Sequence, residues 1–266
     1  MSRVTPQHAF VLHQWAWSET SLILDLFTRG QGRLAVVAKG AKRPYSQLRP
    51  VLMPFQRLLV LTGVPKAAEA ANVLTLRSAE YAGAGAALPP ARLFTGFYLN
   101  ELLLKLLARG DPHERLFDAY ADTLLTLAQA EDESTLRAFE LLLLRETGLL
   151  PELHRNTTTQ ELVQAGRRYQ LQADAGLVAT DGPGIDASAC QAMQAALDDQ
   201  DLAALRSACQ SELPALKSQL RALLVYHLGS PPLRTRQMML ELRRLTETVP
   251  SPHELPQAHH EPARRP

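Results

Sequence analysis

Turns that contain glycine or proline divide the first 80 residues into short runs rich in β-branched and aromatic residues. Each run is long enough for a strand and too short for a helix that buries one face. Strands are predicted in this way over residues 9–17, 21–27, 33–38, 55–61 and 72–77. Five short strands favour a small closed barrel, either an OB-fold or an SH3-like barrel, and we expect the OB-fold.

Two details of this region bear on function. The alternation in the first run predicts one strand face made of Val11, His13, Trp15 and Trp17. The connection over residues 40–54 is the longest in the barrel, and it contains Pro44, Pro50 and Pro54. Proline has no N–H for strand pairing, so this segment is predicted to be a loop.

A stretch of small residues and prolines over 81–90 marks the change from strand to helical periodicity. Helices are predicted over residues 92–108, 114–130, 135–147, 187–198, 200–210, 213–228 and 235–247, with Ser134 as the cap of the third. Residues 149–185 break this rhythm and contain a predicted hairpin, 168–172 with 177–180. The fold class is therefore α+β: an N-terminal barrel domain over 1–80, a mostly α-helical domain over 81–248 and a proline-rich, disordered tail over 249–266.

Positive charge is concentrated at the front of the chain. Residues 1–80 contain ten Lys/Arg against four Asp/Glu, whereas residues 81–266 contain eighteen against twenty-three. Between Leu26 and Ala68 there is no carboxylate, but there are eight cations: Arg29, Arg33, Lys39, Lys42, Arg43, Arg49, Arg57 and Lys66. Cations of one sign repel each other, so a block of this kind indicates a polyanionic partner.

Lysine and arginine on a small barrel can follow a phosphate backbone, and an exposed aromatic ring can stack on a base. The predicted nucleic-acid contacts are Arg29, Arg33, Lys39, Lys42, Arg43, Tyr45 and Arg49. For the aromatic residues Trp15, Trp17, Phe27 and Phe55 we expect core positions, and Tyr45 is the expected exception because it lies in the loop.

A weaker cationic cluster lies between Arg206 and Glu247, with seven Lys/Arg against three Glu. Arg234 and Arg236 stand at the start of a helix, where cations are poorly placed for the helix dipole. A groove lined by apolar helix and cations could hold an acidic peptide with an apolar end. Arg221, Arg234 and Arg236 are the candidate contacts for such a partner or for DNA.

Nothing in the sequence predicts catalysis. Nucleophile-elbow, zinc-protease and phosphate-loop motifs are absent from the chain, and Cys190 and Cys209 fall in helical stretches. We therefore expect no enzyme activity, no cofactor and no metal. The N-terminus does not resemble a signal peptide, and no apolar run approaches the roughly 20 residues of a membrane span. A cytoplasmic protein that does not contact the membrane is expected.

Four segments together resemble the RecO family of bacterial recombination mediators. They are Phe27-Thr28-Arg29 with Gly32, the run from Val37 to Arg43, the helical segment Gly96 to Leu102, and Gly229 to Arg236. The resemblance implies an N-terminal OB-fold and a helical C-terminal domain. It also implies non-enzymatic binding of single- and double-stranded DNA, annealing of complementary strands, and help in loading recombinase in the RecF pathway. The partners it implies are RecR and the acidic C-terminal tail of single-stranded-DNA-binding protein (SSB).

On this resemblance Lys39, Lys42 and Arg43 are DNA-contacting cations. Many members of the family carry a four-cysteine zinc motif where this chain has residues 149–180, which contain no cysteine. The insertion is therefore expected to be a hairpin without zinc. Two other functions remain open: a protein adaptor whose basic block meets an acidic surface, and an RNA-binding OB-fold protein.

Overall fold

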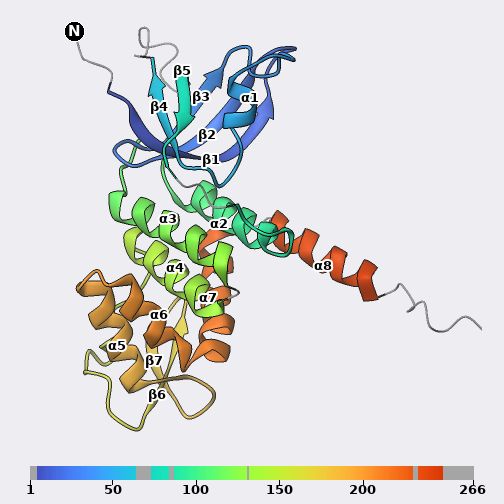
Figure 1. Cartoon of the computed structure of the whole chain (residues 1–266). Coiled ribbons are helices and arrows are strands. Elements are labelled where there is room, and N and C mark those ends of the chain that lie inside the picture. Colours follow the sequence, from blue (N-terminus) through green and yellow to red (C-terminus); the bar gives the residue numbers. More distant parts are fainter. Residues whose placement is uncertain (1–4, 64–72, 84–86, 131, 230–232, 248–266) are drawn as a thin grey trace, which may run out of the picture.

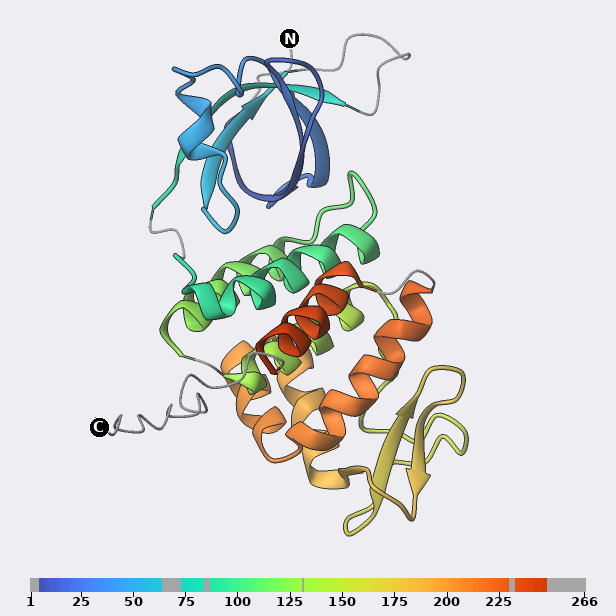
Figure 2. The ribbon, with the colours of Figure 1, turned by 90° about the vertical axis from the view of Figure 1, so that its right-hand side faces the viewer.

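The computed structural model describes residues 5–63, 73–83, 87–130, 132–229 and 233–247. A closed barrel lies at one end of the molecule and a set of helices at the other (Figure 1). Viewed from the side, the helices form a separate layer below the ring of strands (Figure 2). The predicted α+β fold class, with an N-terminal five-stranded barrel followed by a mostly helical part, is confirmed.

The barrel strands are β1 (Gln7–Ala16), β2 (Leu22–Thr28), β3 (Gly32–Ala38), β4 (Leu58–Thr62) and β5 (Leu74–Tyr81). Their order is β1-β2-β3-β5-β4, and β1 pairs with β4 to close the barrel. Only the β3–β5 pair is parallel among these strands. This is a five-stranded Greek-key barrel of the OB type.

The predicted single face of β1 is wrong, because the strand contains a β-bulge between Val11 and His13. Val11 pairs with Leu26, and both lie in the barrel interior. After the bulge, Trp15 pairs with Ile23, which lies on the opposite face of β2 from Leu26. One extra residue moves every later side chain to the other face. His13 and Trp15 therefore point out of the barrel.

The loop after β3 contains a short helix, α1 (Leu48–Val51), which the sequence did not predict. Pro50 is in its first turn, where the missing N–H costs no helical hydrogen bond. The connection remains the longest one in the barrel, as predicted.

The helical part contains α2 (Leu93–Leu106), α3 (Glu114–Gln129), α4 (Glu133–Glu146), α5 (Ala187–Asp198), α6 (Leu202–Gln210), α7 (Leu213–Leu228) and α8 (Arg234–Glu247), with a 3-10 turn, η2 (Pro90–Arg92), before α2. Ser134 was predicted as the cap of α4, but the cap lies two residues earlier in the chain. Asp132 is the N-cap, and its Oδ1 accepts a hydrogen bond of 2.9 Å from the backbone N–H of Ser134. Ser134 is inside the helix, where its backbone N–H and its hydroxyl both donate to the Asp132 carboxylate.

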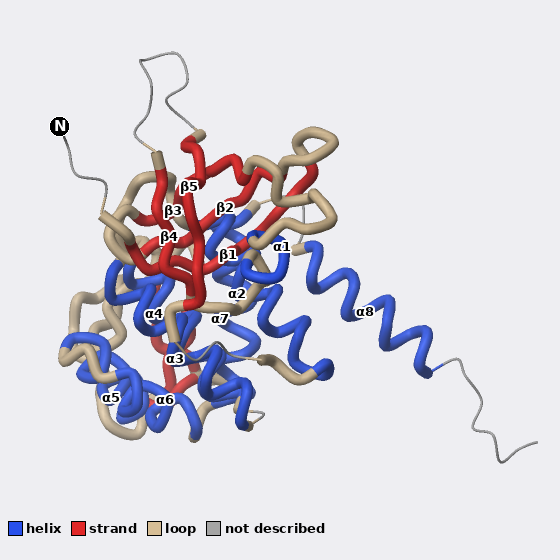
Figure 3. The backbone as a smooth tube through the Cα atoms, turned by 45° about the horizontal axis from the view of Figure 1, so that its top comes forward, coloured by secondary structure: helices blue, strands red, loops and turns tan. Residues whose placement is uncertain are grey.

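The predicted hairpin is confirmed as β6 (Arg168–Gln172) and β7 (Gly176–Thr180), and a short β8 (Ile185–Asp186) extends it. Figure 2 shows the hairpin strands, in yellow, at the end of the molecule away from the barrel, and Figure 3 shows the barrel strands in red above the helices. Side chains fasten the insertion: Thr157 Oγ1 accepts from Leu177 N–H at 2.9 Å, and Gln219 Oε1 accepts from Leu171 N–H at 2.8 Å.

The barrel and the helices share one apolar core. Phe10 and Phe27, on the outer face of the barrel, pack against Phe117 and Tyr120 of α3, with ring centroids 5.0–6.3 Å apart. Asn100 of α2 donates a 3.0 Å hydrogen bond to the backbone carbonyl of Leu12. The helical part therefore covers the outer barrel face around Phe10 and Phe27.

The backbone of β3 also meets the helical part. Gly32 has φ +65, and a Cβ there would overlap the carbonyl of Asp111. The next contact is a 3.0 Å hydrogen bond from Gly110 N–H to Arg33 O. Only glycine allows the chain after α2 to approach the barrel so closely.

Two predictions about segments are not tested by the structure. The boundary between the predicted domains stays a prediction, and the tail over 249–266 lies outside the described residues. No described helix is long and apolar enough to cross a membrane.

Candidate nucleic-acid interface and partner groove

The segment that follows β3, residues 39–49, is here called the cationic loop. It lies at the upper right of the barrel in Figure 1, at the end of β3 away from the helices. Five of the predicted nucleic-acid contacts are exposed in it: Lys39, Lys42, Arg43, Tyr45 and Arg49. Tyr45 is 94% exposed, so it contributes an unburied ring beside the charges.

Local hydrogen bonds give this loop its shape. Gly40 has φ +73, a left-handed conformation that glycine adopts without strain. The N–H of Arg43 donates to Gly40 O at 3.1 Å, and the N–H of Ser46 donates to Arg43 O at 3.1 Å. These successive turns carry the chain from β3 to α1 and leave the long cationic side chains in solvent.

Lys42 joins the cationic loop to the β1–β2 turn. Its backbone N–H donates to Thr20 O at 2.9 Å, and its Nζ donates to Ser18 O at 3.0 Å. The β1–β2 turn and the cationic loop, which β2 and β3 separate in the sequence, thus form one surface at the end of the barrel.

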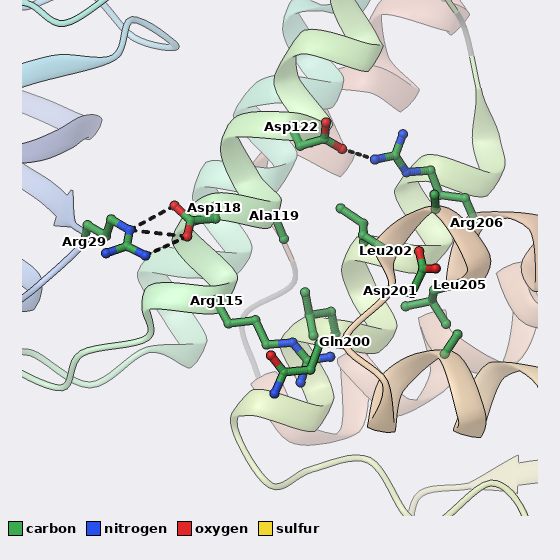
Figure 4. Close-up of a pocket in the computed structure, with 13 residues that line it drawn as sticks. Arg29, Arg115, Asp118, Ala119, Asp122, Gln200, Asp201, Leu202, Leu205 and Arg206 are labelled. Carbon is green, nitrogen blue, oxygen red and sulfur yellow. Dashed lines mark hydrogen bonds and ion pairs between the residues drawn. The ribbon is translucent and has the colours of Figure 1, made fainter.

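Two of the predicted contacts, Arg29 and Arg33, lie elsewhere. Arg29 forms an ion pair with Asp118 at 2.9 Å (Figure 4) and another with Glu114 at 2.7 Å, and both carboxylates are on α3. The hydrogen bond to Asp118 raises the pKa of the Arg29 guanidinium. Arg33 is half-buried and donates a hydrogen bond to the Leu104 carbonyl of α2. Both cations therefore contact oxygen atoms of the helical part. Burial lowers the pKa of Arg33.

The other two cations of the sequence block are not in the loop either. The Arg57 guanidinium stands 5.9 Å from the ring centroid of Phe117, at cation–π distance. Lys66 lies outside the described residues. The cations that are close in the sequence are therefore divided in space between the cationic loop and the contact with the helical part.

The expectation for the aromatic residues is half right. Phe27 and Phe55 are buried, and Tyr45 is exposed as predicted. The expectation of core positions is wrong for Trp17, which is 65% exposed, and for Trp15, which is 37% exposed. The bulge in β1 and the end of the strand at Ala16 remove both indoles from the core.

A cavity of about 550 Å³ lies where α3, α5 and α6 meet Arg29 of the barrel (Figure 4). Its cations are paired: Arg29 with Asp118, Arg206 with Asp122, and Arg115 with Glu146 at 3.7 Å. No nucleophile stands beside a base among its lining residues. It is a pocket between ion pairs, with no catalytic arrangement.

A second hollow of about 400 Å³ is here called the partner groove, and it lies between α2, α4, α7 and α8. Leu136, Leu224, Val225, Leu233, Met239 and Leu240 supply much of its apolar lining. Its cations are Arg92, Arg137, Lys217, Arg221 and Arg236. Arg221 and Arg236 were predicted, whereas Arg92, Arg137 and Lys217 were missed because they come from three separate helical segments.

Arg234 is placed differently. Its backbone N–H donates to Glu101 Oε1 at 2.8 Å, and the N–H of Thr235 donates to Glu101 Oε2 at 3.0 Å. Burial raises the pKa of Glu101, but the hydrogen bonds from Thr235 and Arg234 outweigh it and hold the pKa below its usual value. A carboxylate from α2 therefore caps the cation-rich start of α8, which explains how two arginines are tolerated there.

The wall of the partner groove rests on a buried polar network. Glu140 is fully buried, accepts a 2.6 Å hydrogen bond from Tyr98 Oη and pairs with Arg137 at 3.0 Å. Burial raises the pKa of Glu140 despite this cation. The network orients Tyr98 and Arg137 toward the groove that both residues line.

Cys190 and Cys209 are buried, as predicted. Burial raises the pKa of each thiol to about 12, so neither is a thiolate nucleophile near neutral pH. Within the part of the chain that the structure describes, no group of three or more His, Cys, Asp or Glu side chains could hold a metal ion. The absence of zinc from the insertion stays a prediction.

The barrel with an exposed cationic loop, joined by a common core to a helical part, defines a two-part protein of the OB-barrel class. Comparison with known families narrows the class. The chain belongs to the RecO family, since residues 1–80 match "Recombination protein O N terminal" and residues 90–237 match "Recombination protein O C terminal".

Individual relatives agree with this assignment. A protein of Verminephrobacter eiseniae named DNA repair protein RecO is 48% identical over 252 residues, which cover 91% of this chain and 98% of the relative. Proteins with the same name from Variovorax paradoxus and Acidovorax ebreus are 47% and 46% identical over 261 and 260 residues, again covering 91% of this chain and 98% of each relative.

Proposed function

We propose that this protein is a non-enzymatic mediator of DNA repair and recombination in the RecF pathway. In this proposal it binds single- and double-stranded DNA, anneals complementary strands, and acts with RecR to load recombinase onto strands coated by SSB. Membership of the RecO family supports the repair role. A cytoplasmic location and the absence of any cofactor are part of the same proposal.

The observation that carries the proposal is the state of the cationic loop. None of the ion pairs among the described residues involves Lys39, Lys42, Arg43 or Arg49. Arg29 and Arg109, by contrast, are each paired with a carboxylate. Exposed cations without a carboxylate at hand are suited to phosphate oxygens, and contacts of that kind position a backbone without reading its sequence.

The direct test is fluorescence anisotropy of a labelled single strand across a salt series. If three cations neutralise three phosphates, the slope of log K against log[salt] falls by about 0.7 per lost contact on single strands. Changing Lys39, Lys42 and Arg43 to Glu together should therefore flatten the salt dependence and weaken binding by at least about a hundredfold at low salt.

A matched pair of single variants separates a local contact from the overall charge. Arg43→Glu and Arg167→Glu make the same charge change at exposed arginines, the first in the cationic loop and the second in the insertion. Only Arg43→Glu is expected to weaken binding. Equal losses in both variants, or binding insensitive to salt, would contradict the proposal. Stronger binding of structured RNA than of single-stranded DNA would favour the RNA-binding alternative.

The partner groove is proposed as the site for the acidic tail of SSB. Apolar residues from α7 and α8 can receive an apolar end, while Arg221 and Arg236 can pair with an acidic segment. Lys217 also lines the groove but is paired with Glu133 at 2.8 Å. A labelled tail peptide should bind the intact protein and lose affinity in Arg221→Glu. Arg155→Glu, in the insertion and outside the groove, is the control. Tail binding without any DNA binding would favour the adaptor alternative.

A further inference from the structure

The two tryptophans of the chain, Trp15 and Trp17, are exposed at the end of β1 that leads into the turn contacted by Lys42 of the cationic loop. We propose that they form a stacking surface for unpaired bases, so that this end of the barrel binds single strands in preference to duplexes. The inference rests on the proposed DNA binding and adds a base contact to the phosphate contacts.

Strand register fixes the position of Trp17. Leu22 of β2 pairs with Ala16 of β1 on one side and with Ala38 of β3 on the other, so the three residues form one row across the sheet. Trp17 is one residue beyond this row on β1, and Lys39 is one residue beyond it on β3. The indole and the first cation of the loop therefore leave the barrel at the same edge.

A second contact joins the same two segments. Lys42 donates to the carbonyls of Ser18 and Thr20, the residues on either side of Glu19 in the β1–β2 turn. Trp17 immediately precedes that turn, and its own N–H donates to Ser21 O at 3.1 Å. A strand whose phosphates lie on Lys39 and Lys42 would place its bases within reach of Trp17.

Trp15 extends this surface along the outer face of the barrel. It stacks on His13, with ring centroids 5.4 Å apart and planes inclined by 33°. The same outer face is covered at Phe10 by α3, but His13 and Trp15 are exposed. A single exposed apolar ring is normal on a protein surface, but these rings lie at the barrel edge from which the cationic loop also departs, which makes them suited to binding.

The charge around the rings suits a polyanion. Lys39, Lys42 and Arg43 are exposed, and the β1–β2 turn that Lys42 contacts carries one carboxylate, Glu19, which takes part in none of the ion pairs found among the described residues. An aromatic ring accepts any base, because every base has a π-face, and each stacked base contributes about 1–3 kcal/mol, which is about 5- to 150-fold in affinity. In a duplex those faces are covered by neighbouring base pairs. Stacking therefore discriminates between single strands and duplexes without discriminating between sequences.

Intrinsic fluorescence reports on this site alone, because the chain contains no other tryptophan. Titration with an oligothymidylate longer than about 16 nucleotides, the upper site size of one OB barrel, should quench the emission. A duplex of equal length, at equal occupancy measured by anisotropy of a labelled strand, should quench it much less. Equal quenching by both would overturn the preference for single strands.

Variants test the stacking energy. Trp17→Ala should weaken single-strand binding about tenfold, within the range for one stacked base, and Trp17→Phe should restore most of it. Tyr226→Ala, which removes a similarly exposed ring on α7, is the matched control and should have no effect. An oligonucleotide with abasic sites keeps its phosphates and lacks bases, so Trp17→Ala should cause no further loss on that strand.

These outcomes separate the two proposals. If the Lys39, Lys42 and Arg43 charge reversal abolishes binding while Trp17→Ala binds normal and abasic strands like the parent, the stacking proposal is wrong and DNA binding stands. If the parent protein binds neither strand, the proposed function itself fails.

Discussion

Arg33 and Lys39 belong to the same cationic block and the same hairpin, yet they are in opposite situations. Arg33 is near the start of β3, is half-buried and donates to a carbonyl of α2. Lys39 follows the end of β3 and is exposed. Seven strand residues rise by about 23 Å, which takes the chain from the contact with the helices to the open end of the barrel. Both residues are positively charged, but their positions at opposite ends of β3 decide that Arg33 contacts the helical part and that Lys39 is exposed.

The largest expected effect concerns the core behind the paired region. Phe117→Ala removes the ring that packs on Phe10 and Phe27, and it should lower the free energy of unfolding by about 3–5 kcal/mol in urea denaturation. Trp17→Ala, at the open end, should change it by less than about 0.5 kcal/mol. Similar losses for the two variants would contradict the distinction between a covered and an open outer face.

The next prediction compares an arginine of the cationic loop with an arginine that is ion-paired to the helical part. Arg43→Ala should weaken DNA binding about five- to tenfold at low salt and leave the melting temperature unchanged, since it removes one phosphate contact. Arg29→Ala should lower the melting temperature and change DNA affinity by less than about twofold, because its charge is already neutralised by Glu114 and Asp118. Anisotropy measures the DNA affinity of both variants, and thermal unfolding measures their melting temperatures. A loss of DNA affinity in Arg29→Ala as large as in Arg43→Ala would show that the ion-paired region also binds DNA.

A third prediction extends the comparison to the arginines of α8. Glu101→Ala removes the cap at Arg234 and Thr235, which should cost about 1 kcal/mol of stability and weaken binding of the tail peptide through movement of α8. Because the pKa of Glu101 is below 4.5 in the folded protein, its contribution is present above pH 4.5 and is lost as the pH falls through the folded pKa.

Urea titrations above and below that pH provide the measurement, with Glu101→Gln as the control that keeps an acceptor without the charge. The difference between parent and Glu101→Gln should shrink in acid. A difference that grows as the pH falls would contradict the assigned direction of the pKa shift.

The smallest effect is expected at Glu19, the carboxylate that the fold brings to the cationic loop. Glu19→Gln removes an exposed negative charge beside Lys42 and should strengthen DNA binding by about twofold at low salt, with less effect as salt screens the charge. Glu152→Gln, another exposed carboxylate, in the insertion, should leave DNA affinity unchanged. Unchanged binding in Glu19→Gln at low salt would indicate that the β1–β2 turn does not approach the strand, and weaker binding would contradict the expected repulsion.

Much of the fold was accessible from local patterns. The five strands were found within a few residues because period and turn residues are properties of neighbouring positions. Asp132 was missed as a cap because Ser134 offered an equally plausible oxygen in the sequence, and only the backbone path selects between them. The bulge after Val11 could not be predicted, because no particular residue type marks the extra residue of a bulge. It reversed the faces assigned to His13 and Trp15.

The candidate sites divide in the same way. The cationic loop could be predicted because its charges are consecutive and its prolines exclude a strand. The partner groove could be predicted only in part, since Arg92, Lys217 and Arg236 are distant in sequence and meet through packing of η2, α7 and α8.

The sequence by itself determined the elements, the class of fold and the concentration of positive charge, because strand and helix periods and net charge depend on residues near one another. The tertiary structure alone decided which cations are neutralised, which tryptophans face solvent and which helices share a groove. Those properties depend on distances between residues far apart in the chain, and only burial and pairing in the folded molecule set them.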